Sequence, residues 1–333
     1  MSVNRNMSAS RNMKTRQRTN TNRSHYPPQS PRKLANEIVT SRGKWQDYFD
    51  EHHIETTERG PDEEQAVLFT HHGAGYSALS FATLTRELCL EYPHIAVVSI
   101  DARAHGSSSG DECDLSLDCL LSDYVTVVEN VCRSFSAPHY VFLAGHSLGG
   151  AVVCRIATQN LLADVAGVIV IDIVEEAALL ALRSMPATLA RRPVSFSTLE
   201  DAIYWALMSG TCRNTESASI SIPDQLVRTE GIFQWKVNLL QCRPFWEDWF
   251  RGLSQAFVDC AIPRVLVLAE REYLDRTLMI ASMQGKFQNS IIRNTGHAIQ
   301  EDQPNLLAQL IGTFVDRNMA VARLNAQRVA LNR

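Results

Sequence analysis

The segment Val141–Gly150, with the sequence VFLAGHSLGG, constrains the fold of this 333-residue chain more than any other stretch. Four apolar residues run directly into Gly-His-Ser-Leu-Gly, and a helix-like apolar run follows. This order predicts a buried strand, a very tight turn and a helix, as in the nucleophile elbow G-x-S-x-G. We expect glycines at 145 and 149 because side chains there would collide with the neighbouring strand and helix. Ser147 would then present its hydroxyl at the helix N-terminus. The alternative is a glycine-rich turn without chemistry.

Composition favours a globular chain with no nucleic-acid or membrane partner. Hydrophobic residues make up 45% of the sequence, which is enough for a sizeable core, and the net charge is only −4. No apolar run is long enough to span a membrane. The eight cysteines form no C-x-x-C pair and no metal-ligand spacing, and the sequence shows no signal peptide. We therefore expect reduced thiols, no metal, and a cytoplasmic and/or nuclear location.

The two ends of the chain differ from its middle. Residues 1–44 hold ten Lys and Arg but one acidic residue, Glu37, among many Asn, Ser, Thr and Gln. Such a composition cannot bury a core, so it predicts a disordered basic tail. A transit peptide or a phosphorylatable or partner-binding tail is the alternative. We expect one domain over residues 45–320 and a C-terminal extension over 321–333.

Apolar strand candidates alternate with helix candidates from residue 66 onward. The expected strands are 66–70, 95–100, 140–144, 165–171, 264–269 and 290–293, and the expected helices are 79–90, 117–135, 150–162, 177–185 and 305–318. This alternation predicts the α/β class, with a mostly parallel sheet covered by helices on both faces.

Residues 186–260 interrupt the alternation. They are rich in aromatic residues and methionine and look helical. Inserted between late strands, they would form a helical cap over the carboxyl ends of the strands, where the active sites of α/β proteins lie. The equally weighted alternative is an ordinary helical layer on the sheet.

A small-residue loop, His72-Gly73-Ala74-Gly75, follows the first predicted strand. In α/β-hydrolases a His-Gly-Gly-Gly loop at this place gives one backbone N–H to an oxyanion hole, and the residue after the serine gives another. The expected donors are the N–H groups of Gly73 or Ala74 and of Leu148. Donors fixed where negative charge develops often provide the largest catalytic effect.

His297 is the expected base. It lies after the last predicted strand and before the last helix, which is the Ser…Asp…His order of α/β-hydrolases. His105 is the main alternative. For the acid, Asp172 ends the strand after the elbow helix, whereas the commoner position is one strand later, where the chain has Glu270, Glu272 and Asp275. The residues alone leave this choice open, because an acid at either strand end could orient the imidazole.

At this level of detail the chain resembles the protein phosphatase methylesterase family. The matching segments span roughly residues 45–315 and are Trp45-x-x-Tyr-Phe49, 72–81, Asp101-x-Arg-x-His-Gly106, 145–150, 170–175, 244–250 followed by Gly-Leu-Ser, Met283-Gln-Gly-Lys-Phe287 and 296–302. Many hydrolases share the elbow and the oxyanion loop. The Ile-Asp-x-Val-Glu, Trp-x-x-Trp-Phe and Met-Gln-Gly-Lys-Phe segments are far more specific.

The resemblance implies an activity, a partner and a set of site residues. Family members have the α/β-hydrolase fold and remove the methyl ester from the C-terminal leucine of the type 2A protein phosphatase catalytic subunit, without a cofactor. The triad acid is then Asp172, beside Ser147 and His297. The resemblance also suggests a groove for the phosphatase tail, for which the candidate residues are His72, Trp249, Met283, Gln284 and Phe287.

Two departures from the family pattern matter. The family has an extra hairpin before the first core strand, and the 16 residues from Asp50 to Gln65 look too few for it. Its loss is expected to expose a sheet edge and reduce stability. The chain also has Glu175-Glu-Ala-Ala where the family tends to have Glu-Gly-Thr-Ala, which adds a carboxylate near Asp172. A small-molecule esterase and a non-catalytic phosphatase-binding regulator are the alternative functions.

Overall fold

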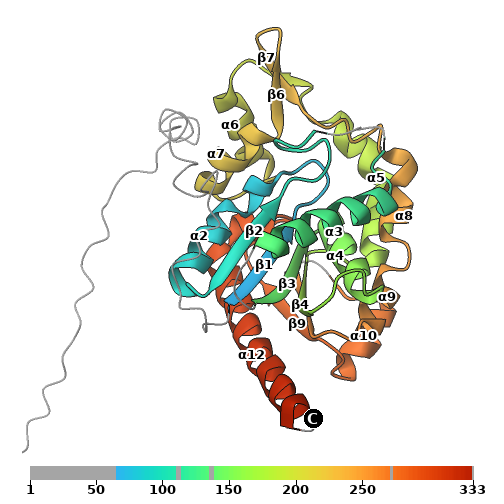
Figure 1. Ribbon diagram of the computed structural model, residues 1–333. Helices are drawn as coiled ribbons and strands as arrows, with labels where there is room; N and C mark the ends of the chain where they lie inside the picture. Colours follow the sequence, from blue (N-terminus) through green and yellow to red (C-terminus); the bar gives the residue numbers. More distant parts are fainter. Residues whose placement is uncertain (1–64, 110–113, 135–138, 271–272, 332–333) are drawn as a thin grey trace, which may run out of the picture.

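A six-stranded parallel sheet forms the centre of the molecule (Figure 1). The computed structural model describes residues 65–109, 114–134, 139–270 and 273–331. The strand order is β2-β1-β3-β4-β8-β9, and every neighbouring pair is parallel. The strands are β1 Gln65–His71, β2 Ile95–Ile100, β3 His139–His146, β4 Val165–Ile171, β8 Arg264–Ala269 and β9 Gln288–Ile292. The predicted α/β class with a parallel sheet is confirmed.

Helices cover both faces of this sheet. The helices of the described chain are η2 Ala78–Phe81, α2 Ala82–Glu91, α3 Leu117–Ser134, α4 Leu148–Thr158, α5 Glu175–Ala190, α6 Leu199–Ser209, α7 Thr215–Asp224, η3 Arg243–Phe245, α8 Trp246–Phe250, α9 Leu253–Asp259, α10 Arg276–Met283, α11 Ile299–Asp302 and α12 Pro304–Leu331. Each helix predicted from the sequence is present, with ends that differ by a few residues except at the C-terminus. There α12 continues unbroken into 321–331.

Alternate strand residues point to opposite layers, as the strand period of two requires. Val67 and Phe69 of β1 pack with α3, α4 and the helices α8 to α10. Ala66 and Leu68 of the same strand pack with α2 and α12 on the other face. Both sets are fully buried, which explains why β1 is an uninterrupted apolar run rather than an alternating one.

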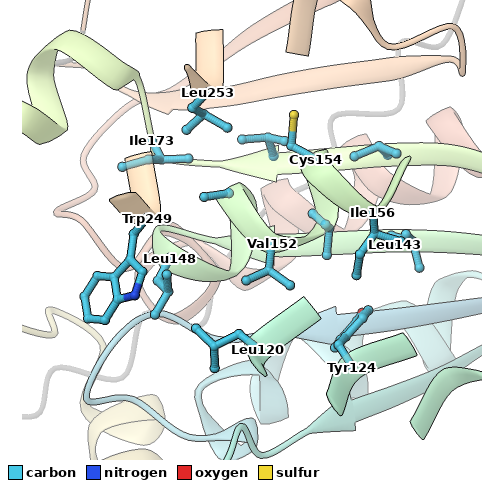
Figure 2. Packing of buried hydrophobic residues seen from close by; sticks show 14 of the residues in the cluster. Leu120, Tyr124, Leu143, Leu148, Val152, Cys154, Ile156, Ile173, Trp249 and Leu253 are labelled. Atoms are coloured by element: carbon cyan, nitrogen blue, oxygen red, sulfur yellow. The ribbon is translucent and has the colours of Figure 1, made fainter. Parts of the chain in front are cut away.

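The helix after the elbow lies at the centre of one layer (Figure 2). Val152 and Ile156 of α4 are fully buried, and Leu148 at its start is 2% exposed. Figure 2 shows the indole of Trp249 beside Leu148, with Leu120 of α3 close by. The first turn of α4 is therefore held on both sides by apolar side chains, and this fixes the backbone that begins at Ser147.

The segment 186–260 divides into two parts, and it contains strands as well as the expected helices. Its first part contains α6, α7 and a second, antiparallel sheet in the order β5-β7-β6, built from β5 Ser195–Phe196, β6 Leu226–Thr229 and β7 Ile232–Trp235. This part has its own small apolar core, and it gathers at one end of the molecule (Figure 1). We call residues 195–237 the cap. The second part, with α8 and α9, packs on α4 as an ordinary layer.

The strand β2 forms one edge of the central sheet. Its residues 96–100 are half-buried, and the strand is mostly apolar. The predicted basic tail and residues 45–64, where the family's hairpin would start, lie outside the described residues. Within the described ranges β2 has no partner on its outer side.

Candidate active site

Ser147 occupies a strained turn between β3 and α4. Its φ is 52° and its ψ −116°, although it is not a glycine, and its N–H donates to the carbonyl of Ile171 in β4. The flanking glycines make this turn possible. A Cβ on Gly145 would lie 2.1 Å from the carbonyl oxygen of Gly149, and one on Gly149 would lie 2.1 Å from that of His71. Side chains at positions 145 and 149 would therefore collide with neighbouring backbone, as the sequence predicts.

The loop after β1 lies directly against the serine. A Cβ on Gly73 would approach the Cβ of Ser147 to 3.2 Å and Nδ1 of His146 to 3.0 Å. The N–H of Tyr76 donates to the Gly73 carbonyl, and the N–H of Gly75 donates to Nε2 of His105. Within the described ranges, the N–H groups of Ala74 and Leu148 have no protein acceptor. Leu148 opens α4, where backbone N–H groups have no intrahelical partner.

Asp172 and His297 form the only direct carboxylate–imidazole contact near this turn among the described residues. Oδ2 of Asp172 lies 2.8 Å from Nδ1 of His297, and Oδ1 accepts a hydrogen bond from the N–H of Ala269 at 2.8 Å. The carboxylate is 2% exposed, whereas the imidazole is 49% exposed. Within the described part of the chain, Nε2 of His297 has no hydrogen-bond partner. It is therefore free to accept a proton.

The other candidate acids and the other candidate base lie in different environments. Asp275 caps α10 and accepts hydrogen bonds from the N–H of Leu278 and the hydroxyl of Ser254. Glu270 faces Arg293 at 3.9 Å, and Glu272 lies outside the described residues. His105 is 2% exposed and has both nitrogens occupied, since Nε2 accepts from Gly75 and Nδ1 donates to the carbonyl of Arg103.

Four buried histidines surround the turn, and all are held neutral. Burial lowers the pKa of His71 to about 4 and also lowers the pKa of His105. Burial lowers the pKa values of His72 and His146 well below the ordinary range. Each donates one ring N–H to a backbone carbonyl, and His146 donates from Nε2 to the carbonyl of His297 at 2.8 Å. These side chains support the loops without adding charge beside Ser147.

His146 is a site residue that the sequence analysis missed. It occupies the variable position before the serine in G-x-S-x-G, so the motif assigns it no role. Its ring packs against that of His297 with centroids 4.6 Å apart and against that of Tyr76 at 5.2 Å. His146 therefore connects the segment that carries His297 with the loop after β1 that carries Gly73 and Tyr76.

The residues expected to line a substrate groove are either buried or lie away from the serine. His72 is 1% exposed, and its Nε2 accepts from the N–H of Ala102 beneath the loop. Trp249 is 2% exposed and donates to the carbonyl of Leu115 in the core. Met283, Gln284 and Phe287 precede β9, whose first residue pairs with Val265 near the start of β8. They therefore lie at the amino ends of the parallel strands, whereas Ser147 lies at the carboxyl ends.

The described residues contain no cluster of three or more His, Cys, Asp or Glu side chains that could hold a metal ion. In the same ranges, none of the helices combines the length and the apolar character that crossing a membrane requires. The extra carboxylate, Glu176, is exposed in the first turn of α5.

Known structures match this fold over most of the chain. An E-2-(acetamidomethylene)succinate hydrolase aligns over 76% of this chain and 92% of its own with a TM-score of 0.64 at 18% identity. An esterase of Mycobacterium tuberculosis aligns over 76% and 86% with a TM-score of 0.59 at 19% identity. The model of the alpha/beta hydrolase family matches residues 67–310. The architecture and the site thus define an α/β-hydrolase.

Closer relatives specify the family. Protein phosphatase methylesterase 1 of Schizosaccharomyces pombe is 38% identical over 293 residues, which cover 84% of this chain and 86% of that protein. The protein of the same name from Bos taurus is 34% identical and covers 77% and 78%. A probable protein phosphatase methylesterase 1 of Caenorhabditis elegans is 37% identical and covers 82% and 77%. The chain belongs to the protein phosphatase methylesterase family and is a carboxylester hydrolase.

Proposed function

We propose that this chain removes the methyl ester from the C-terminal leucine of the type 2A protein phosphatase catalytic subunit, with Ser147, His297 and Asp172 as the catalytic triad. The observation that supports it most is the 2.8 Å contact between Oδ2 of Asp172 and Nδ1 of His297, beside a serine on a strained elbow. The names of the relatives support a phosphatase as the substrate. A cytoplasmic or nuclear location belongs to the same proposal.

The first half of the reaction transfers the leucine acyl group to the enzyme. Nε2 of His297 takes the proton of the Ser147 hydroxyl as Oγ attacks the ester carbonyl carbon. The negative charge moves to the carbonyl oxygen, where the N–H groups of Leu148 and of Gly73 or Ala74 stabilise it. The bond to the methoxy oxygen then breaks, and His297 returns the proton to that oxygen, so methanol leaves.

The second half releases the phosphatase. Water enters the position vacated by methanol and gives a proton to His297 as its oxygen attacks the acyl carbon. The bond to Ser147 breaks, the serine recovers the proton, and the leucine leaves as a carboxylic acid that releases its proton to solvent and becomes a carboxylate. Asp172 holds the imidazole in the tautomer with the proton on Nδ1 and stabilises the imidazolium in both halves.

Demethylation of carboxymethylated type 2A phosphatase catalytic subunit tests this proposal. The wild-type chain should remove the methyl group, and Ser147→Ala should lower kcat on the order of a millionfold. Asp172→Asn should lower kcat about 10⁴-fold, because an uncharged amide favours the wrong tautomer. Asp275→Asn separates the two candidate acids and should retain activity. Loss of activity in Asp275→Asn with retention in Asp172→Asn would reject the assigned triad.

The two alternative functions give different results in the same experiment. A small-molecule esterase would hydrolyse short acyl esters in a Ser147-dependent way and leave the phosphatase methylated. A non-catalytic phosphatase-binding protein would hydrolyse neither substrate, and a fluorophosphonate probe would not label Ser147, since labelling needs an activated serine.

A further inference from the structure

The segment that carries His297 has no regular secondary structure of its own. It runs from residue 293 to residue 298, between β9 and α11. Asn294 has a positive φ of 60°, and the segment therefore departs from a simple extended path. Hydrogen bonds from outside must fix its backbone, because no helix or strand ladder does so. The carbonyl of His297 accepts from His146, which fixes the backbone on the C-terminal side of the histidine.

Asp302 fixes the backbone on the other side of the histidine. Its Oδ2 accepts a hydrogen bond from the N–H of Gly296 at 2.5 Å, and Gly296 immediately precedes His297. The Asp302 side chain is fully buried. A hydrogen bond to a carboxylate is stronger than one between neutral groups, particularly away from water. The position of Gly296 is therefore set by a strong and directional contact.

The same carboxylate also binds the cap. Its Oδ1 accepts a hydrogen bond from the N–H of Arg213 at 2.7 Å, and Arg213 lies between α6 and α7. The two segments meet closely, since a Cβ on Gly296 would lie 3.5 Å from the carbonyl oxygen of Gly210. The preceding residue of α11 adds a second connection, because the carbonyl of Glu301 accepts from the hydroxyl of Ser217 in α7.

We infer that Asp302 is a positioning residue for the hydrolysis: it holds the backbone of the His297 segment against the cap loop 210–213, so that the imidazole is fixed toward Ser147. This inference rests on the proposed role of His297. Both oxygens of Asp302 accept backbone N–H groups, so its role is to orient another group. Small displacements of a catalytic base lower the rate strongly, and for this reason the holding contact matters for activity.

Asp302→Asn tests this inference with little change in side-chain volume. An amide can offer its oxygen to only one of the two N–H groups and turns a donor toward the other. Glu175→Gln is the matched control. Glu175 likewise accepts two backbone N–H groups from a distant segment, those of Gly252 at 2.7 Å and Ser254 at 3.0 Å.

The readouts are steady-state hydrolysis of a short p-nitrophenyl ester and the rate at which a fluorophosphonate labels Ser147. In Asp302→Asn we expect kcat and the labelling rate to fall at least about tenfold, with KM changed less than about twofold. Glu175→Gln should keep both rates within about twofold of wild type. Wild-type rates in Asp302→Asn, or an equal loss in Glu175→Gln, would overturn the inference.

Amide hydrogen exchange keeps this test separate from the proposed function. The N–H groups of Gly296 and Arg213 should exchange faster in Asp302→Asn than in wild type, whether or not the triad is correct. Unchanged exchange at both would also overturn the inference. If Ser147→Ala or His297→Ala retained full activity, the proposed triad would be rejected. The positioning role of Asp302 in catalysis would then be rejected as well. Faster exchange in Asp302→Asn would in that case show only that Asp302 holds the segment.

Discussion

At the scale of single residues, the site depends on two strained positions at the ends of adjacent strands. Ser147 follows β3 with a φ of 52°, and Asp172 follows β4 with a φ of 51°. Each such conformation costs roughly 1–3 kcal/mol in a non-glycine residue and persists where surrounding contacts hold it. The contacts here are backbone hydrogen bonds, from Ser147 N–H to Ile171 and from Asp172 N–H to Val267. The strain therefore lies where the proposed nucleophile and acid must point out of the sheet.

The close approach at Gly145 gives a prediction at this scale. In Gly145→Ala the new Cβ meets backbone atoms of α4, and flexible side chains cannot relieve this contact. We expect a loss of unfolding free energy of roughly 1–3 kcal/mol in urea denaturation. Because α4 must move away from β3, labelling of Ser147 by a fluorophosphonate should also slow at least about tenfold.

Gly285→Ala provides the comparison for that prediction. Gly285 has a φ of 68°, and a Cβ there would meet no atom within 4 Å. Its replacement should cost roughly 1–2 kcal/mol through backbone strain alone and leave the labelling rate unchanged. Equal labelling rates in wild type and Gly145→Ala would contradict the account of the elbow.

At the scale of secondary-structure elements, the strands and the elbow could be predicted from local sequence pattern. The sheet of the cap, which depends on tertiary packing, could not. The strands were predictable because they are short apolar runs. The elbow was predictable because only glycine fits at position 145, beside Gly149, and at position 149, beside His71. The antiparallel sheet of the cap was missed, since the two residues of β5 and the four each of β6 and β7 are too short to show a period. The residue pattern alone left the choice of Asp172 open, because strand order does not fix which strand end faces the histidine, and only the family resemblance implied it.

The contact between the cap and the rest of the molecule contains a buried acid. Glu301 of α11 is 1% exposed and faces α7. Burial raises its pKa from 4.5 to about 8, although Ser221 and Cys212 lower it in part. Between these two values the folded chain keeps a proton that the unfolded chain has lost. The contribution of Glu301 to the free energy of unfolding should therefore fall as pH rises from about 4.5 to about 8, and then stay level.

Glu301→Gln should remove this dependence. One pKa unit corresponds to about 1.36 kcal/mol, so above about pH 8 the variant should exceed wild type in unfolding free energy by at most about 5 kcal/mol. Urea denaturation between about pH 5 and about pH 9 measures it. The difference between variant and wild type isolates Glu301 from the buried histidines, whose lowered pKa values act in the opposite direction. Exposed Glu176→Gln is the control, and a constant difference across pH would contradict the prediction.

At the scale of the whole molecule, the residues proposed to carry out the hydrolysis all lie in the described part of the chain. The triad candidates and the glycine loop follow β1, β3, β4 and β9, and none of them contacts the outer side of β2. The half-buried edge at β2 is separated from Ser147 by β1. A shorter N-terminal region should therefore affect stability or association more than chemistry at the serine.

We propose that Ser147 attacks the leucine methyl ester of the phosphatase and that its acyl–oxygen bond breaks. Demethylation of the carboxymethylated catalytic subunit in water enriched in heavy oxygen, with wild type and Ser147→Ala side by side, tests this step. We expect one heavy oxygen in the leucine carboxylate, unlabelled methanol, and no reaction with Ser147→Ala. Heavy oxygen in the methanol, demethylation by Ser147→Ala, or an untouched phosphatase beside hydrolysed short esters would contradict it.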